Sequence, residues 1–156
     1  MRISAILLIR LCLTQPAAAL LCGTFLSPMS VSANNLSFGN YLAGSASTAN
    51  TTVTIKCPLL GQNLLPDFRV QLSAGNAAAP DTRYLKLSSG KLYYNIFTDS
   101  GFGTVWGDGS AASVERTFDA LLSLGSISFS GFGRVPSGQF IPAGTYTDRI
   151  PFTVIF

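Results

Sequence analysis

Residues 145–156 read TYTDRIPFTVIF and carry the clearest folding signal of the chain. Every second residue of an extended strand lies on the same face, and here one face holds Tyr146, Asp148, Ile150, Phe152, Val154 and Phe156. Pro151 has no N–H to give to a neighbouring strand, so we expect this strand at the edge of a sheet. An amphipathic edge strand is prone to aggregate unless another segment covers it.

Four earlier stretches alternate in the same way, so that in each of them the more apolar residues share one face. These faces hold Thr51, Val53, Ile55 and Cys57; Phe68, Val70 and Leu72; Leu92, Tyr94 and Ile96; and Ile127 and Phe129. Residues typical of turns, such as Gly39-Asn40 and Gly107-Asp108-Gly109, separate the strands. The pattern predicts an all-β fold, an antiparallel β-sandwich in one domain over residues 34–156. Residues 113–124 are the exception, because their apolar spacing predicts a turn or two of helix.

Composition narrows the classes of function. Hydrophobic residues make up 47% of the 156 residues and charged residues only 11%, which favours a packed core over a disordered chain. The chain has no histidine, which excludes imidazole bases and His-ligated zinc. From residue 34 onward, eight Lys and Arg face seven Asp and Glu, so we expect no nucleic-acid partner.

Residues 1–33 are expected to be a secretory signal peptide. Arg2 and Arg10 precede an apolar run from Ala17 to Leu26, and small residues follow. This run is shorter than the ~20 residues that a membrane span needs, so we expect no stable span. Cleavage after Ala33 fits the pattern best, and cleavage after Ala19 is the alternative.

The cleavage point decides the cysteine chemistry. Cleavage after Ala33 leaves Cys57 as the only thiol, whereas cleavage after Ala19 keeps Cys22 and permits a Cys22–Cys57 disulfide. Such a bridge would contribute roughly 3–4 kcal/mol in an oxidising compartment. The sequence leaves both alternatives open, and it contains no cysteine spacing typical of a metal site.

Two groups of residues invite a chemical interpretation. Trp106, beside Gly107-Asp108-Gly109, could stack on a sugar, although packing inside the sandwich is the more common role of such a residue. Glu115 and Asp119 could form a carboxylate pair, although charges at this spacing are more often simply solvated. No nucleophile–base set can be named, so we expect neither an enzyme nor a cofactor.

Several motifs together resemble the spore coat protein U domain family, which includes subunits of archaic chaperone–usher pili. In chain order they are Leu36-Ser37-Phe38-Gly39-Asn40-Tyr41, Thr54-Ile55-Lys56-Cys57, Leu92-Tyr93-Tyr94-Asn95-Ile96-Phe97-Thr98-Asp99, Trp106-Gly107-Asp108-Gly109, Gly133-Arg134-Val135-Pro136 and Ala143-Gly144-Thr145-Tyr146-Thr147-Asp148. Each motif is weak alone, but their order and spacing match the family over essentially the whole chain after the leader.

The resemblance implies an incomplete immunoglobulin-like β-sandwich that lacks its last strand. It further implies export to the periplasm of a Gram-negative bacterium, where a pilus chaperone binds the subunit. An outer-membrane usher and neighbouring subunits would then build a cell-surface fimbrium or coat, with roles in adhesion and biofilm formation.

Two departures from the family pattern bear on these expectations. Met29 stands where the family commonly has a cysteine paired with the one matching Cys57, so a disulfide here would have to involve Cys22. Polymerising members also carry an N-terminal donor extension, and cleavage after Ala33 would leave almost none. The resemblance then implies a terminal or accessory subunit.

The expected site is a groove beside the last strand, lined by Ile150, Phe152, Val154 and Phe156. A strand from the chaperone, and later one from a neighbouring subunit, would fill it by strand addition. The alternative function is a secreted or fibre-tip adhesin that binds carbohydrate through Trp106.

Overall fold

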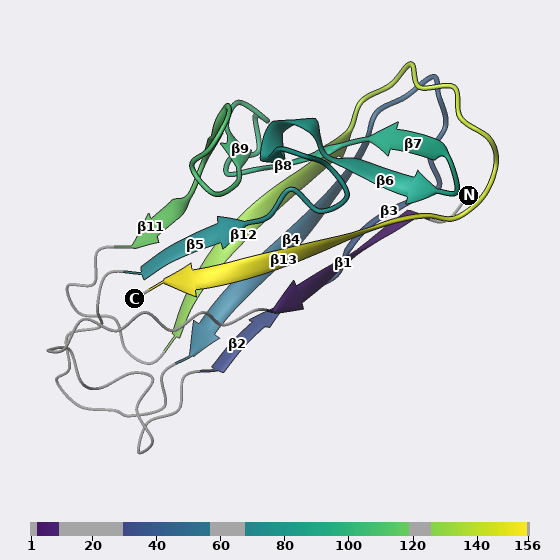
Figure 1. Cartoon of the computed structure of the whole chain (residues 1–156). Coiled ribbons are helices and arrows are strands. Elements are labelled where there is room, and N and C mark those ends of the chain that lie inside the picture. Colours follow the sequence, from purple (N-terminus) through teal and green to yellow (C-terminus); the bar gives the residue numbers. More distant parts are fainter. Residues whose placement is uncertain (1–2, 10–29, 57–67, 119–125, 156) are drawn as a thin grey trace, which may run out of the picture.

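Two β-sheets face each other in the computed structural model of the chain (Figure 1). The structure describes residues 3–9, 30–56, 68–118 and 126–155. In these ranges, the only helix is the short 3-10 turn η1 (Pro80–Thr82), and no helix is long and apolar enough to cross a membrane.

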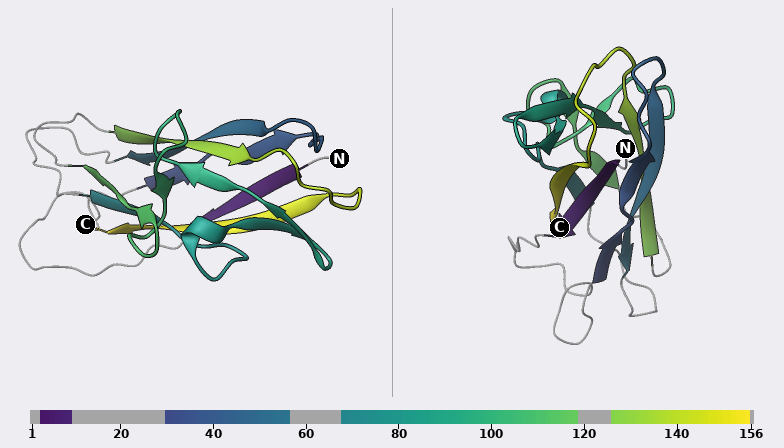
Figure 2. Two further views of the ribbon diagram at one scale, coloured as in Figure 1. Left: turned by 90° about the horizontal axis from the view of Figure 1, so that it is seen from above. Right: turned by 90° about the vertical axis from the view of Figure 1, so that its right-hand side faces the viewer.

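The first sheet contains seven strands. Five follow one another in the order β11 (Arg116–Phe118), β5 (Phe68–Leu72), β13 (Tyr146–Ile155), β1 (Ile3–Ile9) and β3 (Leu36–Gly39). The hairpin of β6 (Tyr84–Leu87) and β7 (Gly90–Tyr93) joins this sheet where β6 pairs with β13. Two further views show β1 running beside β13 (Figure 2).

The second sheet contains six strands, in the order β10 (Ser113–Val114), β9 (Val105–Trp106), β8 (Asn95–Phe97), β12 (Ser126–Val135), β4 (Ser47–Lys56) and β2 (Ser30–Ala33). Its centre is the antiparallel pair of β4 and β12, which is continuous from Ser126 opposite Lys56 to Val135 opposite Ser47. The chain crosses between the sheets at Tyr94, since β7 belongs to the first sheet and β8 to the second.

The core lies between the sheets and confirms the predicted alternation. Val53 and Ile55 of β4 are buried, as are Ile127 and Phe129 of β12, while the serine between the last two is exposed. Further along β12, Gly133 is buried, and a Cβ at this position would come within 2.7 Å of Leu36. Glycine therefore lets the two sheets approach each other at this point.

The predicted helical turn is wrong over the described part of residues 113–124. Ser113–Val114 and Arg116–Phe118 are strands, and β11 pairs antiparallel with β5. Its Thr117 lies opposite Arg69. Cross-strand pairing and β-branched residues have overridden a weak helical spacing. Residues 119–125 lie outside the described residues.

The predicted edge position of the last strand is also wrong for the full chain. β13 pairs with β5 and β6 on one side and with β1 on the other. The carbonyl of Pro151 accepts a hydrogen bond of 2.9 Å from the N–H of Ser73, just beyond β5. A residue directs its N and its carbonyl to the same neighbouring strand, so the missing N–H of Pro151 faces β5 and leaves the β1 side intact.

The buried Arg83 occupies the hydrogen-bonding position that Pro151 leaves open. If residue 151 were not proline, its N–H would donate a hydrogen bond to the Ser73 carbonyl. In this chain the Ser73 carbonyl instead accepts hydrogen bonds from Arg83 Nε at 2.9 Å and from Arg83 Nη2 at 2.6 Å. The remaining N–H groups of this fully buried side chain reach the Leu72 and Trp106 carbonyls and Asn95 Oδ1. Burial lowers the pKa of Arg83 to about 10, so it remains charged at neutral pH.

Replacement of Arg83 by lysine should therefore destabilise the fold. A lysine carries the charge but cannot present the planar set of donors that four acceptors use here. Hydrogen bonds from charged groups contribute about 1.5–3 kcal/mol each, so we expect Arg83→Lys to lower the free energy of unfolding by about 3 kcal/mol. Urea unfolding measures this change. Arg149→Lys, at an exposed position, is the matched control and should change it by less than about 0.5 kcal/mol.

Candidate functional site

The side of β13 that faces β1 is the candidate functional site. β1 pairs with β13 in parallel over seven residues, from Ile3 opposite Tyr146 to Ile9 opposite Phe152. On its other side β1 pairs antiparallel with β3, with Ala5 opposite Leu36. β1 therefore fills one strand position between β13 and β3, which we call the acceptor groove.

β1 lies within residues 1–33, the segment that the sequence predicts to be a signal peptide. Without β1, the N–H and C=O groups of β13 and β3 on either side of the groove would lose their partners. Such groups must pair with another strand or with water. The completeness of the first sheet thus depends on a segment that export is expected to remove.

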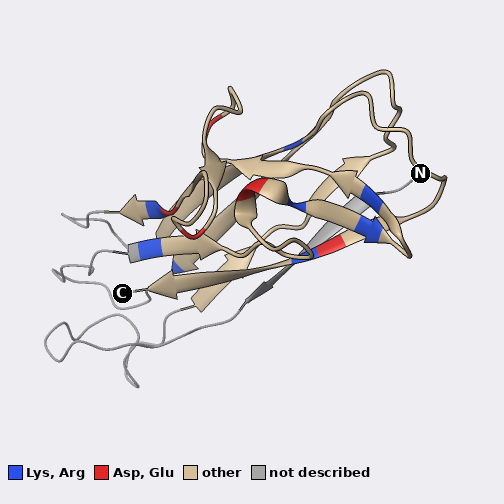
Figure 3. Ribbon diagram, turned by 45° about the horizontal axis from the view of Figure 1, so that its top comes forward, with Lys and Arg blue, Asp and Glu red and all other residues tan. Residues whose placement is uncertain are grey.

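The predicted groove residues on β13 point into the core in the described part of the strand. Ile150, Phe152 and Val154 are each at most 1% exposed with β1 in place. Phe156 lies outside the described residues. Beyond Arg149, the strand carries no charge, as the uniform tan colour of its last part shows in Figure 3. The groove is therefore bounded by an apolar strand over its described part.

Asp148 interrupts this apolar face and is itself buried, with 3% of its surface exposed. Its Oδ1 accepts hydrogen bonds from the N–H groups of Asn76 at 2.9 Å and Arg149 at 2.7 Å, and its Oδ2 accepts from the Tyr94 hydroxyl at 2.8 Å. Burial raises the pKa of Asp148 above its ordinary value of 3.8, because desolvation outweighs these hydrogen bonds. Burial also raises the pKa of Tyr94.

The structure corrects the expectation of a ligand contact at Trp106. This residue is fully buried, donates its indole N–H to the Val70 carbonyl at 2.9 Å, and packs against Phe129. A buried indole has no face for a sugar to stack on, so Trp106 belongs to the core. Cys22 and Cys57 lie outside the described residues, so the disulfide stays a prediction.

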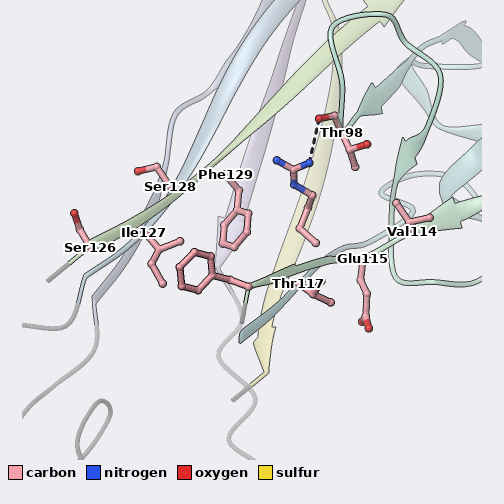
Figure 4. A pocket seen from close by; sticks show the side chains of 10 residues that line it. Thr98, Val114, Glu115, Thr117, Ser126, Ile127, Ser128 and Phe129 are labelled. Atoms are coloured by element: carbon pink, nitrogen blue, oxygen red, sulfur yellow. Dashed lines mark hydrogen bonds between the residues drawn. The ribbon is translucent and has the colours of Figure 1, made fainter. Parts of the chain in front are cut away.

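A hollow of about 720 Å³ opens on the side of the sandwich between β11 and β12 (Figure 4). Arg116 donates to the Thr98 carbonyl there and lies over the Phe129 ring. Glu115 accepts from Gln71 at 2.8 Å and pairs with Arg69, and its predicted carboxylate partner Asp119 lies outside the described residues. In the parts of the chain with described positions, no three Cys, Asp or Glu residues gather to hold a metal.

Fold and groove together define a class of protein, an all-β sandwich in which residues 3–9 complete the first sheet. The sequence model of the Spore Coat Protein U domain matches residues 13–153. The chain belongs to this family, as the resemblance predicted.

Two similar proteins illustrate the likeness. Protein U of Myxococcus xanthus is 31% identical over 116 residues, which cover 72% of this chain and 59% of that protein. The chain thus spans less than two thirds of this relative. A similar fold occurs in the crystal structure of the CsuC–CsuE chaperone–tip adhesion subunit pre-assembly complex from archaic chaperone–usher Csu pili of Acinetobacter baumannii. That match has 20% identity and a TM-score of 0.52, and covers 83% of this chain and 40% of the other.

The raised pKa of Asp148 predicts how stability depends on pH. The folded chain binds this proton more tightly than the unfolded chain, so protonation of Asp148 stabilises the fold. As the pH rises from 3.8 through the raised pKa, the wild type should lose stability relative to Asp148→Asn by about 1.4 kcal/mol per pH unit. Above the raised pKa the difference should become constant. Urea titrations of both proteins from pH 3 upward, roughly the range in which carboxyls titrate, measure it.

Asp99 supplies a control of opposite sign. Hydrogen bonds from the N–H groups of Gly103 and Thr104 lower the pKa of this exposed-loop carboxyl. The wild type should therefore gain stability relative to Asp99→Asn as the pH rises toward 3.8. If both comparisons change in the same direction with pH, the assignment of the Asp148 shift to burial is wrong.

Proposed function

We propose that this protein is a structural subunit of a bacterial surface fibre or coat, exported through the periplasm and assembled by strand addition. Membership of the Spore Coat Protein U domain family supports a structural role rather than an enzymatic one. The observation that carries the proposal is the acceptor groove, because its present occupant, β1, lies in the expected signal peptide.

Both candidate cleavage points remove β1, so the proposal does not depend on which one is used. They differ in their effect on β2, which pairs with β4 from Ser30 opposite Lys56 to Ala33 opposite Val53. Val31 and Ala33 of this strand pack against the core. Cleavage after Ala19 would keep these contacts and cleavage after Ala33 would remove them, so we propose cleavage after Ala19.

Loss of β1 would leave the subunit poorly stable on its own. Burial of one large apolar side chain contributes about 1.5–3 kcal/mol. For Ile150 and Phe152, the two predicted groove residues that lie opposite β1, this amounts to at most about 6 kcal/mol, which is comparable with the ~5–15 kcal/mol that stabilises a whole domain. A strand from another polypeptide would restore both the burial and the main-chain hydrogen bonds of the groove.

A periplasmic chaperone is the first partner we propose, followed by an outer-membrane usher and a neighbouring subunit in the fibre. The similarity in fold to a structure described as a chaperone–tip subunit pre-assembly complex supports a chaperone as one of these partners. Exchange of one donor strand for another would keep the groove filled throughout, because each donor supplies the same main-chain hydrogen bonds.

Removal of residues 1–19 tests the proposal. We expect the chain of residues 20–156 to unfold at least about 6 °C below the full chain or to aggregate, since about 3 kcal/mol or more is lost and each kcal/mol shifts Tm by roughly 2–4 °C. A synthetic peptide with the sequence of residues 3–9, added in excess during refolding, should restore a soluble monomer.

Thermal unfolding and size-exclusion chromatography give the result, and a peptide with the same composition in scrambled order is the control. A stable monomer of residues 20–156 that is indifferent to the peptide would contradict the proposal, because its first sheet would need no donor.

Processing of the leader is a separate prediction. We expect the protein recovered from the periplasm to begin at Leu20 and to contain both Cys22 and Cys57. Intact mass with and without reductant measures the cleavage point and the disulfide together, since a disulfide lowers the mass by two hydrogens. A protein that begins at Asn34 would have lost β2, contrary to this expectation.

A further inference from the structure

We infer that the acceptor groove selects the sequence of the strand that fills it. The residue of that strand opposite Asp148 is small or carries a hydroxyl, and the residues two positions before and after it are apolar. The inference rests on the proposed function and names the chemistry of the partner strand. Asp148 is the only charged residue among the inward-facing positions of β13, and it lies within the stretch that β1 covers.

The Asp148 carboxylate has acceptor capacity to spare. An ionised carboxylate offers about four lone-pair sites, and among the described residues three donors use them: the N–H groups of Asn76 and Arg149 on Oδ1 and the Tyr94 hydroxyl on Oδ2. Oδ2 thus receives one hydrogen bond where Oδ1 receives two. A further donor that approaches from the groove would satisfy the remaining site.

The Asp148 carboxylate is held by three hydrogen bonds and has a close backbone neighbour. The backbone of Gly75 lies so close that even a Cβ there would collide with Asp148 Oδ2 and Ile150 Cδ1. Tyr94, which holds Oδ2, is itself fixed by an edge-to-face contact with Phe38, whose ring centroid is 5.6 Å away. The polar group therefore keeps its place whichever strand lies beside it.

The chain's own β1 fits this requirement by register. Ala5 lies opposite Asp148, while Ile3 lies opposite Tyr146 and Leu7 opposite Ile150. Neighbouring strands of a sheet lie about 4.8 Å apart, so position 5 lies close to Asp148. A large apolar side chain on a strand with this register would exclude water from a charged carboxylate, which is unfavourable. A hydroxyl would instead donate to it.

Threonine and valine at position 5 of the full chain give a matched test. The two side chains have nearly the same shape, but only threonine can donate a hydrogen bond. We expect Ala5→Thr to unfold at least 3 °C above Ala5→Val, because a hydrogen bond to a charged group is worth several degrees in a chain of this length. Thermal unfolding at pH 7 measures both Tm values.

The same pair at position 7 is the control. Leu7 lies opposite the apolar Ile150, so Leu7→Val should unfold at a higher temperature than Leu7→Thr. This is the reverse of the order expected at position 5. If the valine variant has a higher Tm than the threonine variant at both positions, the groove is uniformly apolar and the inference is overturned.

Ala5→Pro separates this inference from the proposed function. A proline in a central strand removes a ladder hydrogen bond, so this variant should have the lowest Tm at position 5. If Ala5→Pro lowers Tm while Ala5→Val has a higher Tm than Ala5→Thr, only the selection by Asp148 is overturned. If Ala5→Pro leaves Tm unchanged, residues 3–9 do not fill the groove, and both the inference and its support for the proposed function fall.

Discussion

The pairing of β13 with a strand on its β1 side is the interaction on which the rest of the structure depends. β13 contributes buried side chains along its length and links β5 and β6 to β3 through β1. Because backbone groups in a sheet must be paired or hydrated, an empty groove would expose both the main chain and the apolar side chains of β13 beside it. The fold is therefore complete only when some strand, from this chain or another, occupies that position.

Pro151 and Arg83 place the one missing N–H of β13 on its β5 side. The missing N–H of Pro151 faces β5, where Arg83 donates to the Ser73 carbonyl in its place. Successive residues of a strand direct their N–H groups to opposite sides, so the N–H groups of Ile150 and Phe152 face the groove. The side that faces β1 consequently keeps a full set of donors and acceptors.

Sequence patterns predicted the inward residues of β4, β12 and β13 because alternation depends only on local geometry. The same reasoning misplaced β13 at an edge, since the side to which Pro151 directs its missing N–H depends on a register that no local pattern contains. It also missed the burial of Arg83, whose acceptors Ser73, Asn95 and Trp106 are brought together only by the fold. Asp148 was visible as a lone polar residue on an apolar face, and that signal could have marked it as part of the site.

Amide hydrogen exchange along β13 of the exported protein tests the central claim most directly. The N–H groups of Thr153 and Ile155 face β5 and should be protected from exchange whether or not a partner is bound. The account predicts that those of Ile150 and Phe152 exchange rapidly in the isolated exported chain and become protected when a chaperone or donor peptide binds. Equal protection of all four amides in the isolated chain would contradict it, because the groove side of β13 would then already be paired.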